Sequence, residues 1–332
     1  MSALRGLKLT AASLTLGALA LAVPASAAPG NHVAVMPTHV MGILNGANGD
    51  GNGNGASKHG GGSSTSNMYY HGGTSDGFTG IIGVETTPKV YLVYWGSQWD
   101  NGNDPSGEAS ILTNFFNSVG GSSWNGTVTQ YCQGIASGSA NCTGSSAVPA
   151  GNQSGVYASE WYDNTAAAPS HPTQSQLAAE AVNAAGHFNN TTVGSNASVQ
   201  YVIATATGNS SSGFGTRYCA WHSSTTSNYG DIAYTNLPYI TDAGSSCGAN
   251  FNGLGADAGI TIVGGHEFAE TETDQFPSTG WTDGSGYEIG DKCAWNSLTS
   301  LQNFPNGNSF PVQPLWSNAA NSGNGGCVLS YP

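Results

Sequence analysis

The chain has 332 residues, of which only 8% are charged, with 19 Asp and Glu against 6 Lys and Arg. The resulting net charge of −13 at pH 7 repels phosphate backbones, which argues against nucleic acid as a partner. Beyond the N-terminal segment, no stretch approaches the roughly 20 apolar residues of a membrane-spanning helix. We therefore expect no membrane association once that segment is cleaved.

The first 27 residues have the pattern of a secretory signal peptide. Arg5 and Lys8 form a basic start, residues 9–23 are apolar, and residues 24–27 supply the small side chains of a cleavage site. We predict a signal peptide at 1–27 and a secreted, extracellular mature protein.

Residues 28–82 are low in complexity, and residues 45–66 in particular are mostly Gly, Asn and Ser. Such a composition has little to bury, so we predict a flexible linker or a pro-segment at 28–82. The remaining residues, 83–332, are enough for one substantial core and are predicted to form a single globular domain.

Predicted strands and helices alternate within this domain. They are, in chain order, a buried strand at 89–95, a helix at 111–119, a short strand at 128–132, a helix at 174–188, a strand at 200–206, a strand at 232–240 and a helix at 257–274. Pro238 confines the strand at 232–240 to a sheet edge or a strand end. Asp257 is the predicted N-cap of the last helix.

This order of elements predicts an α/β or α+β fold. It matches the order in a zincin-type peptidase core, where an edge strand precedes the metal-binding helix. We therefore predict a zincin-like mixed sheet with packed helices and a loop-rich, disulfide-bonded C-terminal part at 278–332.

Six cysteines lie in the predicted mature chain, and an even number in an exported protein indicates a disulfide framework. No C-x-x-C pair is present to form a zinc knuckle. We expect sequential neighbours to pair, because each bond then closes one local loop. The predicted disulfides are Cys132–Cys142, Cys219–Cys247 and Cys293–Cys327.

Seven of the 19 acidic residues lie within residues 260–295, next to one histidine. Like charges at this density are unfavourable unless a cation lies among them, and Lys292 is the single basic side chain there. The segment therefore predicts a bound metal ion.

On the helix predicted at 257–274, His266, Glu270 and Asp274 are spaced four apart and share one face, with Glu267 beside them. The pattern resembles H-E-x-x-H, in which two ligands lie one turn apart and the glutamate accepts a proton from a metal-activated water. Glu270 replaces the second histidine, and a carboxylate is an accepted zinc ligand. We predict zinc bound by His266 and Glu270 with Glu267 as the catalytic base, and calcium as an alternative or additional ion.

A third ligand must come from outside this helix, and Glu288 and Asp291 follow after a turn at Pro277. Their distance from Glu270 resembles that of the third glutamate in gluzincin-type peptidases. We favour Glu288 as the third ligand and Asp291 as a further ligand or a residue that orients His266, and the two roles are exchangeable. Three other side chains are candidates to steady an oxyanion, although packing is their more common role: Tyr287, Tyr239 and His222.

Five stretches of the chain, VYLVYWGSQW, QYC, IAYTNLPYI, GGHEFAETETD and GYEIGDKCAW, resemble those of secreted bacterial proteins similar to the plant exordium, or phosphate-induced protein, family. The shared features are Trp95-Gly96 at the end of a strand, the His-Glu-x-x-Glu helix, and the Glu-x-x-Asp-x-Cys motif that ends at Cys293. The resemblance covers most of the chain from Lys89 onward. It implies an extracellular location, and its plant members are growth-linked cell-wall proteins.

These features favour a secreted metal-dependent peptidase that uses a metal-activated water to hydrolyse an extracellular protein or peptide. The alternative is a non-enzymatic extracellular wall or matrix protein of exordium type with a structural calcium site. A glycosidase that pairs Glu267 with Glu288 or Asp291 is a weaker interpretation of the same carboxylates.

Overall fold

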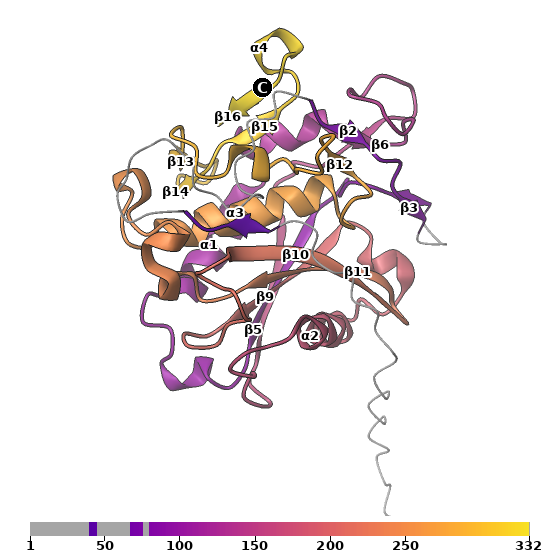
Figure 1. Ribbon diagram of the computed structural model, residues 1–332. Coiled ribbons are helices and arrows are strands. Elements are labelled where there is room, and N and C mark those ends of the chain that lie inside the picture. The colour runs from indigo at the N-terminus through magenta and orange to yellow at the C-terminus, as the bar shows by residue number, and fades with distance from the viewer. Residues whose placement is uncertain (1–39, 45–66, 76–79, 332) are drawn as a thin grey trace, which may run out of the picture.

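The structure is a computed structural model that describes residues 40–44, 67–75 and 80–331 (Figure 1). The predicted signal peptide at 1–27 and the Gly-, Asn- and Ser-rich residues 45–66 lie outside the described residues.

A six-stranded mixed sheet forms the centre of the fold, in the order β1-β10-β11-β9-β5-β8. Its strands are β1 (Met41–Gly42), β5 (Lys89–Trp95), β8 (Tyr157–Asp163), β9 (Val199–Thr205), β10 (Tyr218–Ser227) and β11 (Gly230–Leu237). The strands β8, β5, β9 and β11 run parallel, whereas β10 is antiparallel to β11 and β1 is antiparallel to β10. Because parallel neighbours need a crossover connection, helices lie between β5 and β8 and between β8 and β9 in the chain.

Helices cover both faces of this sheet, with α1 and α3 on one face and α2 on the other (Figure 1). The α-helices are α1 (Glu108–Val119), α2 (Gln174–His187), α3 (Ala258–Thr273) and the short α4 (Ala320–Gly323). The alternation of side chains along β5 explains the two layers, since Leu92 and Tyr94 pack in the core with α1 and α3 while Val93 packs with α2. The predicted α/β class is confirmed.

Short elements surround the sheet, and most of them form two-stranded pairs. The remaining strands are β2 (Tyr69–Tyr70), β3 (Thr74–Ser75), β4 (Ile81–Ile82), β6 (Cys132–Gln133), β7 (Val148–Pro149), β12 (Trp281–Thr282), β13 (Ser300–Asn303), β14 (Ser309–Val312), β15 (Leu315–Ser317) and β16 (Gly326–Val328). The 3-10 helices are η1 (Trp99–Asn101), η2 (Asn125–Gln130), η3 (Val193–Asn196), η4 (Ile240–Cys247), η5 (Phe251–Gly253) and η6 (Asp291–Cys293). The C-terminal part is therefore rich in loops and small hairpins, as predicted.

Several predicted elements need correction. Residues 128–132 form the end of η2 and the start of β6 rather than a strand of the main sheet. The strand predicted at 232–240 ends at Leu237, before Pro238, and lies inside the sheet between β9 and β10. Strands β8 and β10 are not predicted from the sequence, because β8 is half exposed and β10 is rich in Ser and Thr.

The packed domain also begins earlier than Gly83. Within the segment predicted as a linker or pro-segment, Met41 lies in β1, which pairs with β10, and Tyr70 lies in β2, which pairs with β12. Both side chains are buried, as is Met68. These described stretches therefore belong to the domain and bury side chains in its core.

Three disulfides join the cysteines in the predicted pairs: Cys132–Cys142, Cys219–Cys247 and Cys293–Cys327. Disulfides persist in oxidising compartments, which suggests an extracellular environment for this chain. Among the described residues, no helix is long and apolar enough to cross a bilayer.

Candidate metal centre

Helix α3 carries the predicted ligands His266 and Glu270, and all its residues are buried. A helix that is buried on every side must pack closely against several neighbours. Gly265 makes this approach feasible, because a Cβ at this position would lie 3.2 Å from the rings of both Phe115 on α1 and Trp124 beside η2. The chain thus holds α3 between the sheet and the C-terminal hairpins (Figure 1).

The predicted ligands His266, Glu270 and Asp291 lie together. His266 Nε2 is 3.0 Å from Glu270 Oε1 and 3.7 Å from Asp291 Oδ1. Glu270 Oε1 also accepts a hydrogen bond of 2.8 Å from the backbone N–H of Asp291. One ligand atom from each of the three residues lies within 4.8 Å of the others, a spacing at which they could hold one metal ion.

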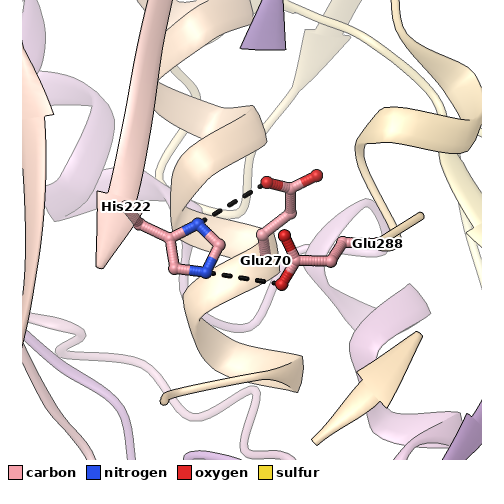
Figure 2. A group of neighbouring side chains, drawn as sticks. All are labelled: His222, Glu270 and Glu288. Carbon is pink, nitrogen blue, oxygen red and sulfur yellow. Dashed lines mark ion pairs between the residues drawn. The ribbon is translucent and has the colours of Figure 1, made fainter. Parts of the chain in front are cut away.

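A second group forms around His222 on β10 (Figure 2). His222 Nδ1 is 3.4 Å from Glu267 Oε2 and 3.6 Å from Glu270 Oε2. The other ring nitrogen, Nε2, is 3.4 Å from Glu288 Oε1. Figure 2 shows one ring nitrogen of His222 facing Glu270 and the other facing Glu288, and one ligand atom from each of these three residues lies within 4.8 Å of the others.

Gln313, which follows β14, fixes the orientation of the His266 ring. Gln313 Nε2 donates to the carbonyl of Gly290 at 2.8 Å, so its Oε1 faces His266 Nδ1 at 3.1 Å as an acceptor. A ring that donates from Nδ1 keeps the lone pair on Nε2, which is the nitrogen that faces Glu270 and Asp291. The predicted orienting role of Asp291 therefore falls to Gln313, and Asp291 lies on the ligand side of the ring.

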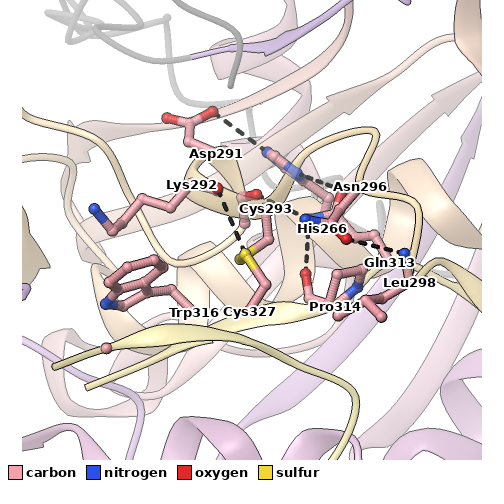
Figure 3. The surroundings of a disulfide bond; sticks show 12 residues. His266, Asp291, Lys292, Cys293, Asn296, Leu298, Gln313, Pro314, Trp316 and Cys327 are labelled. Carbon is pink, nitrogen blue, oxygen red and sulfur yellow. Dashed lines mark hydrogen bonds and ion pairs between the residues drawn. A yellow bond between two sulfur atoms is a disulfide. The ribbon is translucent and has the colours of Figure 1, made fainter. Parts of the chain in front are cut away.

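Other contacts hold the loop that brings Glu288 and Asp291 to the helix (Figure 3). Lys292 Nζ binds Asp283 Oδ2 at 2.7 Å and lies 4.1 Å from the centre of the Trp316 ring. The Cys293–Cys327 disulfide ties the same loop to β16.

At Gly290 the loop touches the cluster itself. A Cβ there would lie 2.7 Å from His266 Nδ1 and 2.9 Å from Glu270 Oε1. Lys292 is paired with Asp283 outside the cluster, so it does not neutralise the acids that surround the two imidazoles.

Asp274, the last member of the predicted row on α3, organises a turn. Its side chain accepts hydrogen bonds from the backbone N–H groups of Ser278, Thr279 and Gly280. These bonds close the C-terminal end of α3 and direct the chain toward β12.

The two imidazoles sit in a strongly negative environment. Burial by itself lowers the pKa of His266, but the carboxylates of Glu270, Glu267 and Asp291 raise it to about 10. For His222 the effect of burial is likewise outweighed, and Glu288, Glu267 and Glu270 raise the pKa well above its usual value. The site therefore favours positive charge among its carboxylates.

The pKa values of the carboxyl groups in the cluster shift in opposite directions. Burial would raise the pKa of Glu270, but the adjacent His266 and His222 lower it. Burial raises the pKa of Glu267, Glu288 and Asp291, and the neighbouring Glu270 carboxylate adds to the increase for each. Glu270 is thus the carboxyl that stays ionised most readily.

Several buried atoms of the cluster have no hydrogen-bond partner, although the side chains are no more than 2% exposed. They include His222 Nε2, His266 Nε2, Glu267 Oε1 and both oxygens of Glu288. Buried polar atoms are normally satisfied, so this set requires an explanation. Nitrogen and carboxylate donors of this kind fit a divalent cation.

The structure brings all five sequence-predicted site residues into one cluster, namely His266, Glu267, Glu270, Glu288 and Asp291. Sequence reasoning gave His222 only an oxyanion role and did not identify Gln313. Alternation along β10 offers a signal for His222, since Trp221 packs toward α2 and the next residue must face α3. No comparable signal marks Gln313.

Comparison of the chain with protein-family models, with curated protein sequences and with solved structures found no match.

Proposed function

We propose that the protein is a secreted metal-dependent peptidase in which His266, Glu270 and Asp291 hold a divalent cation and Glu267 acts as the general base. The observation that carries this proposal is the grouping of two imidazoles and four carboxyls with unsatisfied buried donor atoms. Zinc suits the mixed nitrogen and oxygen donors.

The cation, when bound, would supply Lewis acidity that lowers the pKa of a coordinated water. The protein supplies the proton acceptor. Glu267 follows His266 directly on α3, its Oε1 makes no hydrogen bond, and burial raises its pKa. A carboxylate with a raised pKa accepts a proton from a water and returns it to a leaving amine more readily than an ordinary glutamate.

The arrangement of strands around α3 supports a zincin-like interpretation. His222 lies on β10, the antiparallel strand near one edge of the sheet. Its side chain faces a helix that carries His-Glu-x-x-Glu. The sequence resemblance to the exordium-type secreted proteins involves the same His-Glu-x-x-Glu and Glu-x-x-Asp-x-Cys motifs.

Secretion is supported by two independent features. The N-terminal sequence has the pattern of a signal peptide. The three disulfides require an oxidising compartment to form and persist. The substrate we propose is accordingly an extracellular protein or peptide.

A second candidate function is a wall or matrix protein in which the cluster holds a structural calcium ion. The complete burial of the ligands favours it, since His266 and Glu288 are 0% exposed and Glu267 is 1% exposed. A hydrolytic site must admit a substrate, whereas a structural ion needs no such access. Carboxylate oxygens are also the donors that calcium prefers.

The two candidates are separated by assaying casein hydrolysis by the full chain, with and without a zinc chelator, beside Glu267→Gln. The peptidase predicts bound zinc, hydrolysis that the chelator abolishes, and a loss of at least about 100-fold in Glu267→Gln with the metal retained. Asp257→Asn, an exposed acid at the start of the same helix, is the matched control and keeps full activity. Bound calcium without hydrolysis between pH 3 and 9 would replace the peptidase with the matrix protein.

A further inference from the structure

We propose that the cluster binds two divalent cations side by side, bridged by the carboxylate of Glu270. The first cation is the one already assigned to His266, Glu270 and Asp291. The second is held by His222, Glu270 and Glu288 (Figure 2). The inference rests on the proposed function only in placing the first cation at Glu270.

The two oxygens of Glu270 serve different partners. Oε1 is 3.0 Å from His266 Nε2, while Oε2 is 3.6 Å from His222 Nδ1. Glu270 is a member of both metal-binding groups, and one of its oxygens faces each imidazole. A carboxylate that presents its oxygens to separate histidines is suited to bridge two ions, and such ions lie about 3.5–4 Å apart in dinuclear hydrolytic sites.

The spacing between His222 Nε2 and Glu288 is that of two ligands on one ion rather than that of an ion pair. Charge-assisted hydrogen bonds between imidazolium and carboxylate measure about 2.7–2.9 Å. His222 Nε2 lies 3.4 Å from Glu288 Oε1, whereas the contacts of 3.4 Å to Glu267 and 3.6 Å to Glu270 are made by the other ring nitrogen, Nδ1. Two atoms bound at about 2.0–2.1 Å to one tetrahedral cation lie about 3.3 Å apart.

Glu288 provides the independent observation that points to a ligand. Its side chain is 0% exposed, and neither carboxylate oxygen makes a hydrogen bond of ordinary geometry, although His222 and Asp274 lie beside it. The facing His222 Nε2 is likewise without a hydrogen-bond partner. Leaving such groups buried and unsatisfied is costly, and a cation between them removes the cost.

The donor sets predict which ions bind. Each group offers one imidazole nitrogen and two carboxylates. Imidazole suits zinc and other first-row transition ions, whereas a purely carboxylate site would suit magnesium or calcium. We therefore expect zinc or manganese in both positions.

The decisive experiment counts ions in the wild-type full chain. Protein stripped with a chelator is titrated with Mn²⁺ by calorimetry, and the loaded protein is examined by electron paramagnetic resonance. We expect two Mn²⁺ per chain and a spectrum of two exchange-coupled ions. One ion per chain, or two without magnetic coupling, would overturn the bridged pair.

Variants assign the second position. In Glu288→Gln and His222→Asn we expect one Mn²⁺ per chain with an uncoupled spectrum, because the group of His266 and Asp291 remains. Asp257→Asn should keep two coupled ions. Two ions retained in both Glu288→Gln and His222→Asn would contradict the assignment, and the wild-type count stands as a test even where a variant does not fold.

The outcomes keep this inference apart from the proposed function. Two coupled ions without casein hydrolysis would support the dinuclear centre and sink the peptidase. Chelator-sensitive hydrolysis with one ion per chain would support the peptidase and contradict the dinuclear centre.

Discussion

Buried carboxyl groups gather on two opposite sides of helix α3, and their neighbours differ. On one side Glu267 and Glu270 face two imidazoles. On the other, about half a turn around the helix, Glu272 lies near Glu85, which precedes β5. There the side-chain donors are amides, since Asn125 Nδ2 donates to Glu272 at 3.3 Å and Gln200 Nε2 donates to Glu85 at 2.9 Å.

In the pair Glu85 and Glu272, the neutral carboxyl form is favoured over the carboxylate. Burial raises the pKa of Glu85 to about 8, although the hydrogen bond from Gln200 and the charge of His222 lower it in part. Burial also raises the pKa of Glu272 well above its usual value, and the neighbouring Glu85 adds to the increase. Amides donate hydrogen bonds but bring no charge, so a buried carboxyl among them is cheapest when neutral.

The comparison teaches that burial alone does not make a carboxylate cluster a metal site. Imidazoles, which can carry a positive charge or ligate a cation, distinguish the first cluster from the second, and they keep the Glu270 carboxyl ionised. Both clusters nevertheless arise from one short stretch of helix, HEFAETE.

Chelation should affect the first cluster strongly. Removing a cation that is present at a thousandfold excess over its Kd costs about 4 kcal/mol. For a domain of this size each kcal/mol shifts Tm by about 2–4 °C, so Tm should fall by about 10 °C in calorimetry with a chelator present. An unchanged Tm would show that the imidazoles alone stabilise the carboxylates.

The second cluster should respond to pH and not to chelator. Because the pKa of Glu85 is raised in the folded state, its contribution to stability is fully present below about pH 4.5 and is lost as pH rises through about 8. Glu85→Gln replaces the neutral carboxyl with a neutral amide, so it should be more stable than wild type at pH 8.5, by roughly 2 kcal/mol or more, and similar at pH 4. Urea unfolding at the two pH values measures the difference.

The control for this pH effect is Asp257→Asn, which should follow the wild-type dependence on pH. If Glu85→Gln and wild type lose stability in parallel between pH 4 and 8.5, Glu85 is not the group that titrates.

Gln313 should matter only to the first cluster. Gln313→Met removes the acceptor for His266 Nδ1, and loss of such an orienting partner typically weakens metal affinity about 10- to 100-fold. Gln313→Glu keeps an acceptor at this position and should recover part of the affinity. Competition for Zn²⁺ against a chromogenic chelator gives both values, and equal affinities in the two variants would remove Gln313 from the site.

Asp257→Asn should have the smallest effect. The sequence marks Asp257 as an N-cap, and the structure places it there, but its side chain makes no capping hydrogen bond. An exposed substitution of this kind should change the free energy of unfolding by less than about 0.5 kcal/mol in urea titration. Asp257→Ala removes the side-chain acceptor that Asn retains, so a loss of 1 kcal/mol or more in that variant would indicate that the cap forms in solution.

Local sequence patterns specify several elements of this protein. The apolar run KVYLVYW specifies β5, the alanine-rich residues specify α2, and the boundaries of α3 fall within one residue of the prediction. The disulfide pairing also followed from local loop closure. The spacing His-Glu-x-x-Glu was enough to place His266 and Glu270 on one face of a helix, with Glu267 beside them.

The positions of His222, Gln313 and Glu272 depend instead on contacts between segments that are far apart in the sequence. His222 reaches the cluster because β10 lies beside β11 and faces α3, and β10 itself forms from a Ser- and Thr-rich segment through burial and pairing rather than through an apolar pattern. Gln313 is 47 residues from His266 in sequence and meets it only through the packing of the C-terminal hairpins. The sequence does not distinguish Glu272 from the acids of the cluster. In the packed helix its side chain faces Glu85 and Asn125 instead.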